Sequence, residues 1–136
     1  MKRVFVDTSG FFAHIVRDDD NHEPAQELFA RAEQERWRLF TTVAVVFETH
    51  ALLLHRARPG REIALGFLDK LATDQYQVVR FRRVDEQRAI AIIRSHRDKK
   101  YSLCDAHSFA VMERLRVASA ITFDHDFRTY GRFAVL

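Results

Sequence analysis

The sequence is poor in cysteine, glycine and proline, with one, four and two residues among 136. A lone Cys104 excludes an intrachain disulfide, and the Cys and His residues lack the paired spacing of a structural zinc site. No apolar run approaches the roughly 20 residues that a membrane-spanning helix needs. The apolar segment that follows Met1 is too short for a signal peptide, so we expect a cytoplasmic protein with no membrane contact.

The residues that are present are typical of a globular protein, because 47% are hydrophobic and 30% are charged. A chain of 136 residues without repeats or linkers is expected to form a single domain over residues 1–136. The net charge of +3 suits a polyanionic partner but does not identify one.

Short apolar segments alternate with amphipathic segments along the chain. We expect strands at residues 3–6, 38–42, 76–81 and 118–123, and a short last strand within 132–136. Helices are expected at 22–36, 43–57, 61–73, 84–96 and 103–115. This alternation predicts an α/β fold with a central parallel sheet of about five strands and helices on both faces. Ligands of such sheets bind beyond the carboxyl ends of the strands.

Four acidic residues lie in or beside apolar segments. Asp7 ends the first strand and Asp124 follows the fourth, whereas Glu48 and Asp105 lie in largely apolar helices. Each has a simpler explanation: Asp7 as a helix cap, Asp105 as a partner of a helix dipole, Asp124 as a turn residue, and Glu48 as a partner of an arginine. The four together favour a shared site.

Four converging carboxylates would repel one another unless some are protonated or a cation neutralises them. Oxygen ligands select hard cations such as Mg²⁺ or Mn²⁺. A metal held in this way can supply an activated water and offset charge on a phosphate. The pattern therefore favours hydrolysis of phosphodiester bonds.

These motifs resemble those of the PIN domain, and more narrowly of the toxin ribonuclease of a VapBC-type toxin–antitoxin pair. The resemblance rests on DTS at 7–9, Glu48 in TTVAVVFET, Asp105 in YSLCD and Asp124 in ITFDHDF. It implies a three-layer α/β/α fold and an endoribonuclease that depends on Mg²⁺ or Mn²⁺. It also implies a homodimer and a cognate antitoxin.

Carried over to this chain, the resemblance makes Asp7, Glu48 and Asp105 the acidic core and Asp124 the fourth acid. Asp126 lies in the same turn, and the family pattern favours Asp124. Thr8 matches the polar position beside the first acid, where a hydroxyl can orient a carboxylate or a metal-bound water.

Basic residues gather in three segments, 55–61, 80–83 and 94–101, near the expected ends of helices and strands. Phosphate contacts are expected from some of them, and an aromatic ring among them could stack on a base. The alternative is a solvated face with ordinary ion pairs. The candidates for contact with RNA are Thr8, Arg82, Arg97, Lys99, Lys100 and Tyr101.

Two other functions compete with the ribonuclease. One is a non-catalytic module of the same fold that binds RNA or a protein partner. The other is a phosphoryl-transfer domain with an aspartate phosphoacceptor, which is disfavoured because the last expected strand, RFAVL, lacks the lysine that this chemistry uses.

Overall fold

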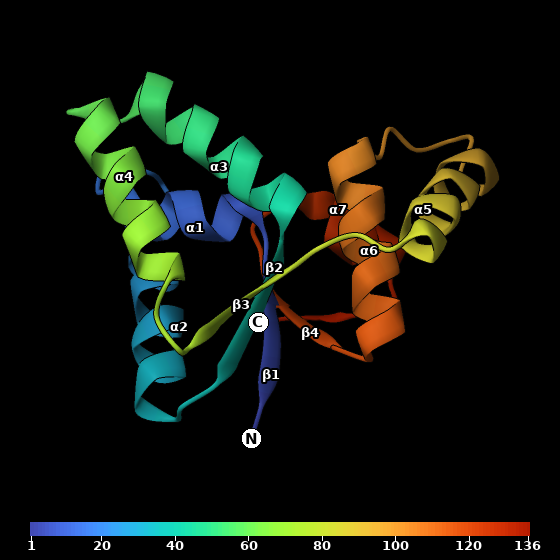
Figure 1. The fold of residues 1–136 in the computed structure, drawn as a ribbon, viewed down its shortest axis with the longest axis horizontal. Coiled ribbons are helices and arrows are strands. Elements are labelled where there is room, and N and C mark those ends of the chain that lie inside the picture. Colours follow the sequence, from blue (N-terminus) through green and yellow to red (C-terminus); the bar gives the residue numbers. More distant parts are fainter.

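The structure is a computed structural model that describes all residues from 1 to 136. A five-stranded parallel sheet in the order β3-β2-β1-β4-β5 lies between two groups of helices (Figure 1). The elements are β1 Arg3–Val6, α1 Thr8–Ile15, α2 His22–Gln34, β2 Arg38–Thr42, α3 Val43–Arg56, α4 Gly60–Leu71, β3 Tyr76–Val79, α5 Arg83–Ser95, α6 Leu103–Leu115, β4 Ser119–Ile121, α7 His125–Tyr130 and β5 Ala134–Val135. The predicted three-layer fold is confirmed.

The centre of the sheet is apolar because helices cover both of its faces. Val4, Phe5 and Val6 of β1 have no exposed surface, and Phe5 pairs in register with Phe40 of β2 and Ala120 of β4. A parallel strand that is buried on both sides has a nearly continuous apolar sequence. This is the physical reason why a charged side chain directly after Val6 is informative.

The order of the strands fixes where a ligand can bind. From β1 the chain adds β2 and β3 on one side, and then returns to add β4 and β5 on the other. The direction of winding therefore reverses between β1 and β4, and the carboxyl ends of these two strands open a crevice. Asp7 follows β1 and the 122–126 segment follows β4, so the topology brings both to this crevice.

The five long predicted helices are confirmed, with ends within two residues of those expected. Three strands are shorter than expected: β3, β4 and β5. The sequence pattern did not identify α1 and α7 as elements, because helices of 8 and 6 residues contain too few turns for a clear periodicity. None of the helices combines the length and the apolar character that crossing a membrane would require.

Candidate active site

Asp7 occupies the N-cap position of α1, yet its side chain makes no capping hydrogen bond. Its carboxylate instead accepts hydrogen bonds from the hydroxyls of Thr122 at 3.1 Å and Ser9 at 3.3 Å, both on Oδ2. The side chain is buried, with the residue 3% exposed. The capping explanation of Asp7 is therefore wrong: its carboxylate is held by the end of β4 and faces the crevice.

The first turn of α1 reaches β4 because Gly10 has no side chain. A Cβ atom there would lie 2.6 Å from the carbonyl oxygen of Ile121, well inside contact distance. This approach lets the Ser9 hydroxyl lie 3.1 Å from that of Thr122 and accept the Phe123 N–H at 2.8 Å. A hydroxyl bridge thus joins α1 to the segment after β4 and fixes the position of Asp7.

Asp105 lies in the first turn of α6, where it forms a capping box with Ser102. The Ser102 hydroxyl accepts the Asp105 N–H at 3.0 Å, and Asp105 Oδ2 accepts the Ser102 N–H at 3.3 Å. The expected location at a helix start is confirmed. The capping bonds also orient the carboxylate, because they fix it at the end of the helix that opens into the crevice.

Asp124 caps α7, and its carboxylate accepts the Asp126 N–H at 2.9 Å. This turn brings Asp126 toward the same crevice. One carboxylate oxygen from each of Asp105, Asp124 and Asp126 lies within 4.8 Å of the others, a spacing that a single cation could bridge. Sequence reasoning left Asp126 outside the set of four acids; only the position of both acids in one short turn could have suggested it.

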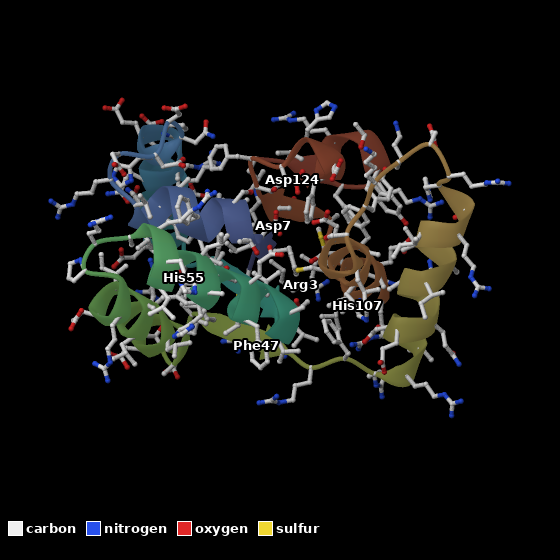
Figure 2. The ribbon with its side chains drawn as sticks, turned by 90° about the horizontal axis from the view of Figure 1, so that it is seen from above. Arg3, Asp7, Phe47, His55, His107 and Asp124 are labelled. Carbon is white, nitrogen blue, oxygen red and sulfur yellow. The ribbon has the colours of Figure 1, made fainter.

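Asp7 and Asp124 lie near each other in the middle of the molecule, between α1 and α6 (Figure 2). Glu48 differs from the other acids because it is exposed, and it belongs to none of the ion pairs of the chain. The pairing of Glu48 with an arginine is therefore wrong. Burial raises the pKa of the Cys104 thiol, and the charges of Glu48, Asp7 and Asp105 raise it further, which places Glu48 at the rim of the same cluster.

The acids of the crevice take part in none of the ion pairs of the chain, and three of them have raised pKa values. Burial and the charge of Asp105 raise the pKa of Asp7 to about 7. Burial and the charge of Asp124 raise the pKa of Asp105 to about 6, and the same two causes raise that of Asp126. Groups buried together and repelling one another in this way favour either protons or a bound cation.

The donor set of the crevice fits a hard divalent cation, because it consists of carboxylate oxygens with no imidazole or thiolate among the three clustered acids. A second feature agrees: the Thr8 hydroxyl oxygen is buried and has no hydrogen-bond partner within the chain. Buried hydroxyls normally have a partner. A water molecule carried by a cation would supply one.

The candidates for contact with RNA on and around the basic segments divide into three groups. Lys99 lies near the acids, because its charge acts on Asp126. Burial and the charge of Asp124 raise the pKa of Asp126, and the charges of His125 and Lys99 lower it in part. Arg82, Arg97 and Lys100 are exposed and form no ion pair, so they are free to contact a ligand.

Tyr101 forms the third group and corrects an expectation. The residue is 7% exposed, and its ring packs edge-on against Phe109 and Tyr130, with centroid distances of 5.3 and 5.9 Å. An aromatic ring packed in the core presents no face for a base. The prediction that Tyr101 stacks on RNA is therefore wrong, and the residue supports the loop that precedes Asp105.

Comparisons with known proteins agree with this geometry. The family model of the PIN domain matches residues 4–132. The chain is 33% identical over 131 residues to the 23S rRNA-specific endonuclease VapC20 of Mycobacterium tuberculosis, with 94% of each chain covered. The crystal structure of that protein, described as a toxin that cleaves the sarcin–ricin loop, matches with a TM-score of 0.86 and 29% identity over 95% of both chains.

More distant structures share the fold alone. FitAcB from Neisseria gonorrhoeae matches with a TM-score of 0.69 and 13% identity over 98% of this chain and 96% of that chain. VapBC2 from Rickettsia felis, bound to a DNA fragment from its promoter, matches with a TM-score of 0.67 and 13% identity over 98% and 97%. The architecture is therefore retained where little sequence identity remains.

Proposed function

The chain belongs to the PIN-domain family, and from that membership we propose that it is a divalent-metal-dependent endoribonuclease, the toxin of a toxin–antitoxin pair. The observation that carries the proposal is the convergence of Asp105, Asp124 and Asp126 beside the buried Asp7. Burial and repulsion between the acids raise the pKa values of Asp7, Asp105 and Asp126, and none of the four acids forms an ion pair with a basic side chain. A purely structural site would pair such charges.

Asp105, Asp124 and Asp126 would hold Mg²⁺ or Mn²⁺, with Asp7 and Glu48 contributing charge directly or through water. The bound ion would lower the pKa of a coordinated water and offset the charge that develops on the scissile phosphate. The chain itself supplies the positioning. The hydroxyls of Ser9 and Thr122 hold Asp7 Oδ2, and the capping box holds Asp105. The buried Thr8 hydroxyl has no hydrogen-bond partner within the chain.

Lys99 beside Asp126, together with Arg82, Arg97 and Lys100, would bind the RNA backbone around the cluster. This arrangement separates two tasks, because basic side chains bind phosphates while the acids bind the metal. Ribosomal RNA is the first substrate to test, since the relative with 33% identity is a 23S rRNA-specific endonuclease.

We also propose an antitoxin partner and a homodimer. The support within the chain is an exposed apolar patch on α3 and α4, formed by Phe47, Leu54, Leu65 and Leu68. Phe47 is 77% exposed, which is costly for a large aromatic side chain unless a protein covers it. In Figure 2 its side chain projects away from the body of the molecule.

Cleavage of ribosomal and total RNA by the purified chain, with Mg²⁺, Mn²⁺ or EDTA, tests this function. We expect discrete metal-dependent fragments and a loss of activity of at least ~1000-fold in Asp105→Asn, because members of one catalytic unit are lost together. Asp98→Asn is the matched control, since Asp98 is an exposed acid before α6 with a side chain 80% exposed.

Two outcomes would contradict the proposal. Cleavage by Asp105→Asn with an unchanged metal requirement would remove Asp105 from the site. Tight RNA binding without turnover at any metal concentration would identify the chain as a non-catalytic binding module instead.

A further inference from the structure

A hollow of about 620 Å³ lies where the C-terminal ends of α1 and α3 meet the start of α4. Its floor is aliphatic and its rim is basic. The floor consists of Ile15, Val16 and Ile63, and the rim carries Arg17, Arg56 and Arg58. The volume is in the range of pockets that enclose a small ligand. None of these residues belongs to the acidic site.

The hollow and the acidic site are connected by two helices that pack against each other. Both α1 and α3 begin at the carboxyl edge of the sheet, directly after β1 and β2, and their other ends form the hollow. Glu48 and Arg56 are eight residues apart on α3, which is about 12 Å along a helix. Figure 2 shows α3 extending from Phe47, near the acids, to His55.

The arginines of the rim are available to a ligand. Arg17, Arg56 and Arg58 are exposed and take part in none of the ion pairs, whereas Arg31, Arg88, Arg114 and Arg132 are paired with acids. Asp18 is the single acid that lines the hollow. The rim therefore carries a net charge of about +2, and unpaired guanidinium groups of this kind bind phosphate.

The corner between α3 and α4 is built to hold this arrangement. A Cβ atom at Gly60 would clash with the carbonyl oxygen of Leu54, so the chain turns tightly only with glycine there. Within the turn, Ala57 is buried and its N–H bonds to the carbonyl of Leu53 at 3.0 Å. The buried Ala57 anchors the segment, while the arginines on either side of it remain in solvent.

We propose that this hollow is a binding subsite for the single-stranded part of an RNA substrate, at a distance of a few nucleotides from the cut. The aliphatic floor accepts one unstacked base, and Arg17, Arg56 and Arg58 bind the phosphates on either side. Proteins stack unstacked RNA bases on aromatic rings or on arginine planes, and here the arginines of the rim would supply the planes above the aliphatic floor. The inference rests on the proposed ribonuclease function, because it assigns the RNA that enters the acidic site a second point of attachment.

Charge decides between RNA and a protein as the occupant. An apolar protein segment would fit better over Phe47 and Leu68, where the hollow is lined by Val46, Phe47, His50 and Leu68 and by no arginine. The hollow instead combines three unpaired arginines with only one acid. A consequence for specificity follows: efficient substrates need an unpaired segment long enough to reach from the acids to this corner.

The test measures RNA binding separately from cleavage. In the Asp105→Asn background, affinity for a single-stranded oligonucleotide of about 12 residues is determined by fluorescence anisotropy over a range of salt concentrations. We expect Arg56→Ala/Arg58→Ala to weaken binding about 10- to 100-fold. The slope of log affinity against log salt should fall by about 1.4, because each lost phosphate contact removes about 0.7.

Two further variants make the result specific. Arg17→Ala removes a rim charge that comes from a different segment, and we expect it to weaken binding about 3- to 10-fold. Arg36→Asn is the matched control, because Arg36 is exposed, unpaired and lies in the turn between α2 and β2, at the opposite edge of the sheet (Figure 1). Asparagine tolerates the positive φ of 56° at this position.

Equal losses in Arg36→Asn and in the rim variants would show a general charge effect and overturn the subsite. Unchanged RNA binding in folded rim variants would also overturn it. Loss of binding to a protein partner with RNA binding unchanged would identify the hollow as a protein-docking site instead. In the active chain, metal-dependent cleavage together with unaltered RNA affinity in the rim variants would overturn the subsite alone, whereas absence of cleavage by the unaltered chain would overturn the nuclease, so the two failures are distinguishable.

Discussion

Two aspartates of this chain are buried to the same degree and behave in opposite ways. Asp7 is 3% exposed and Asp85 is 1% exposed. Burial and the charge of Asp105 raise the pKa of Asp7 to about 7. Burial also raises the pKa of Asp85, but hydrogen bonds from Arg114 and from the Arg82 N–H outweigh it, so the pKa of Asp85 lies below its usual value.

The two pKa values differ because different groups donate hydrogen bonds to the two carboxylates. The Arg114 guanidinium donates to both oxygens of Asp85, at 2.7 and 2.9 Å, and ties the first turn of α5 to α6. The side chain of Asp7 accepts hydrogen bonds only from neutral hydroxyls, those of Ser9 and Thr122. A bidentate ion pair satisfies a carboxylate, whereas hydroxyls orient it and leave its charge uncompensated. Asp85 thus serves the fold, whereas Asp7 keeps an uncompensated charge, which is the basis for its proposed role at a cation site.

The largest effect that separates the two aspartates should be on cleavage. We expect Asp7→Asn to reduce RNA cleavage at least ~1000-fold, about 4 kcal/mol in the activation barrier. Its metal-free melting temperature at pH 8 should be unchanged or higher, because an amide of the same shape keeps the Thr122 contact without a buried charge. Cleavage rates and thermal melts of the purified variant check both statements; a variant that loses stability but cleaves normally would reverse the assignment.

The second effect should be on stability. Asp85→Asn leaves Arg114 without its partner, and because that arginine side chain is 23% exposed we expect a loss of about 2 kcal/mol in the free energy of unfolding. Cleavage measured well below the melting transition should stay within about threefold of the unaltered chain. Urea denaturation gives the first quantity. A variant as stable as the parent would show that the ion pair contributes nothing to the fold.

The third effect, and the most discriminating, is the dependence on pH. The raised pKa of Asp7 means that the folded chain binds more protons than the unfolded chain between about pH 4 and 7, so stability falls as pH rises through this window. The stability of Asp7→Asn relative to the parent should therefore increase by about 1–3 kcal/mol over this range and then level off. Difference melts cancel the opposing contribution of His14, whose pKa burial and Lys70 lower to about 4.

The Asp85→Asn difference should have the opposite sign. The lowered pKa of Asp85 stabilises the fold above the ordinary carboxyl pKa, and this contribution is lost as pH falls through the lowered value. The deficit of Asp85→Asn should thus be complete at pH 7 and shrink in acid. Addition of Mg²⁺ at pH 8 should stabilise the parent more than Asp7→Asn, because a ligand of the folded state raises its stability and Asp7 adds negative charge to the site. Parallel pH curves for the two variants would contradict the comparison.

The sequence by itself determined the class of fold and most of the acids of the site. Val4 to Val6 could be read as a buried strand, and a carboxylate at its end needs a compensating partner, so Asp7 stood out without any structure. Asp124 stood out in the same way after the fourth strand, and Asp105 stood out because it lies in a largely apolar helix. Local sequence carries this information because burial of a strand and the cost of an unpaired charge both follow from neighbouring residues.

Tertiary structure alone decided which side chains meet. Asp126 joins Asp105 and Asp124 because α7 begins with a tight turn, and Tyr101 is buried because Phe109 and Tyr130 surround it. Residues from α1 and from the α3–α4 corner line one hollow although about 40 residues separate them in the chain. The packing of helices onto a sheet sets such distances, and no local pattern records them.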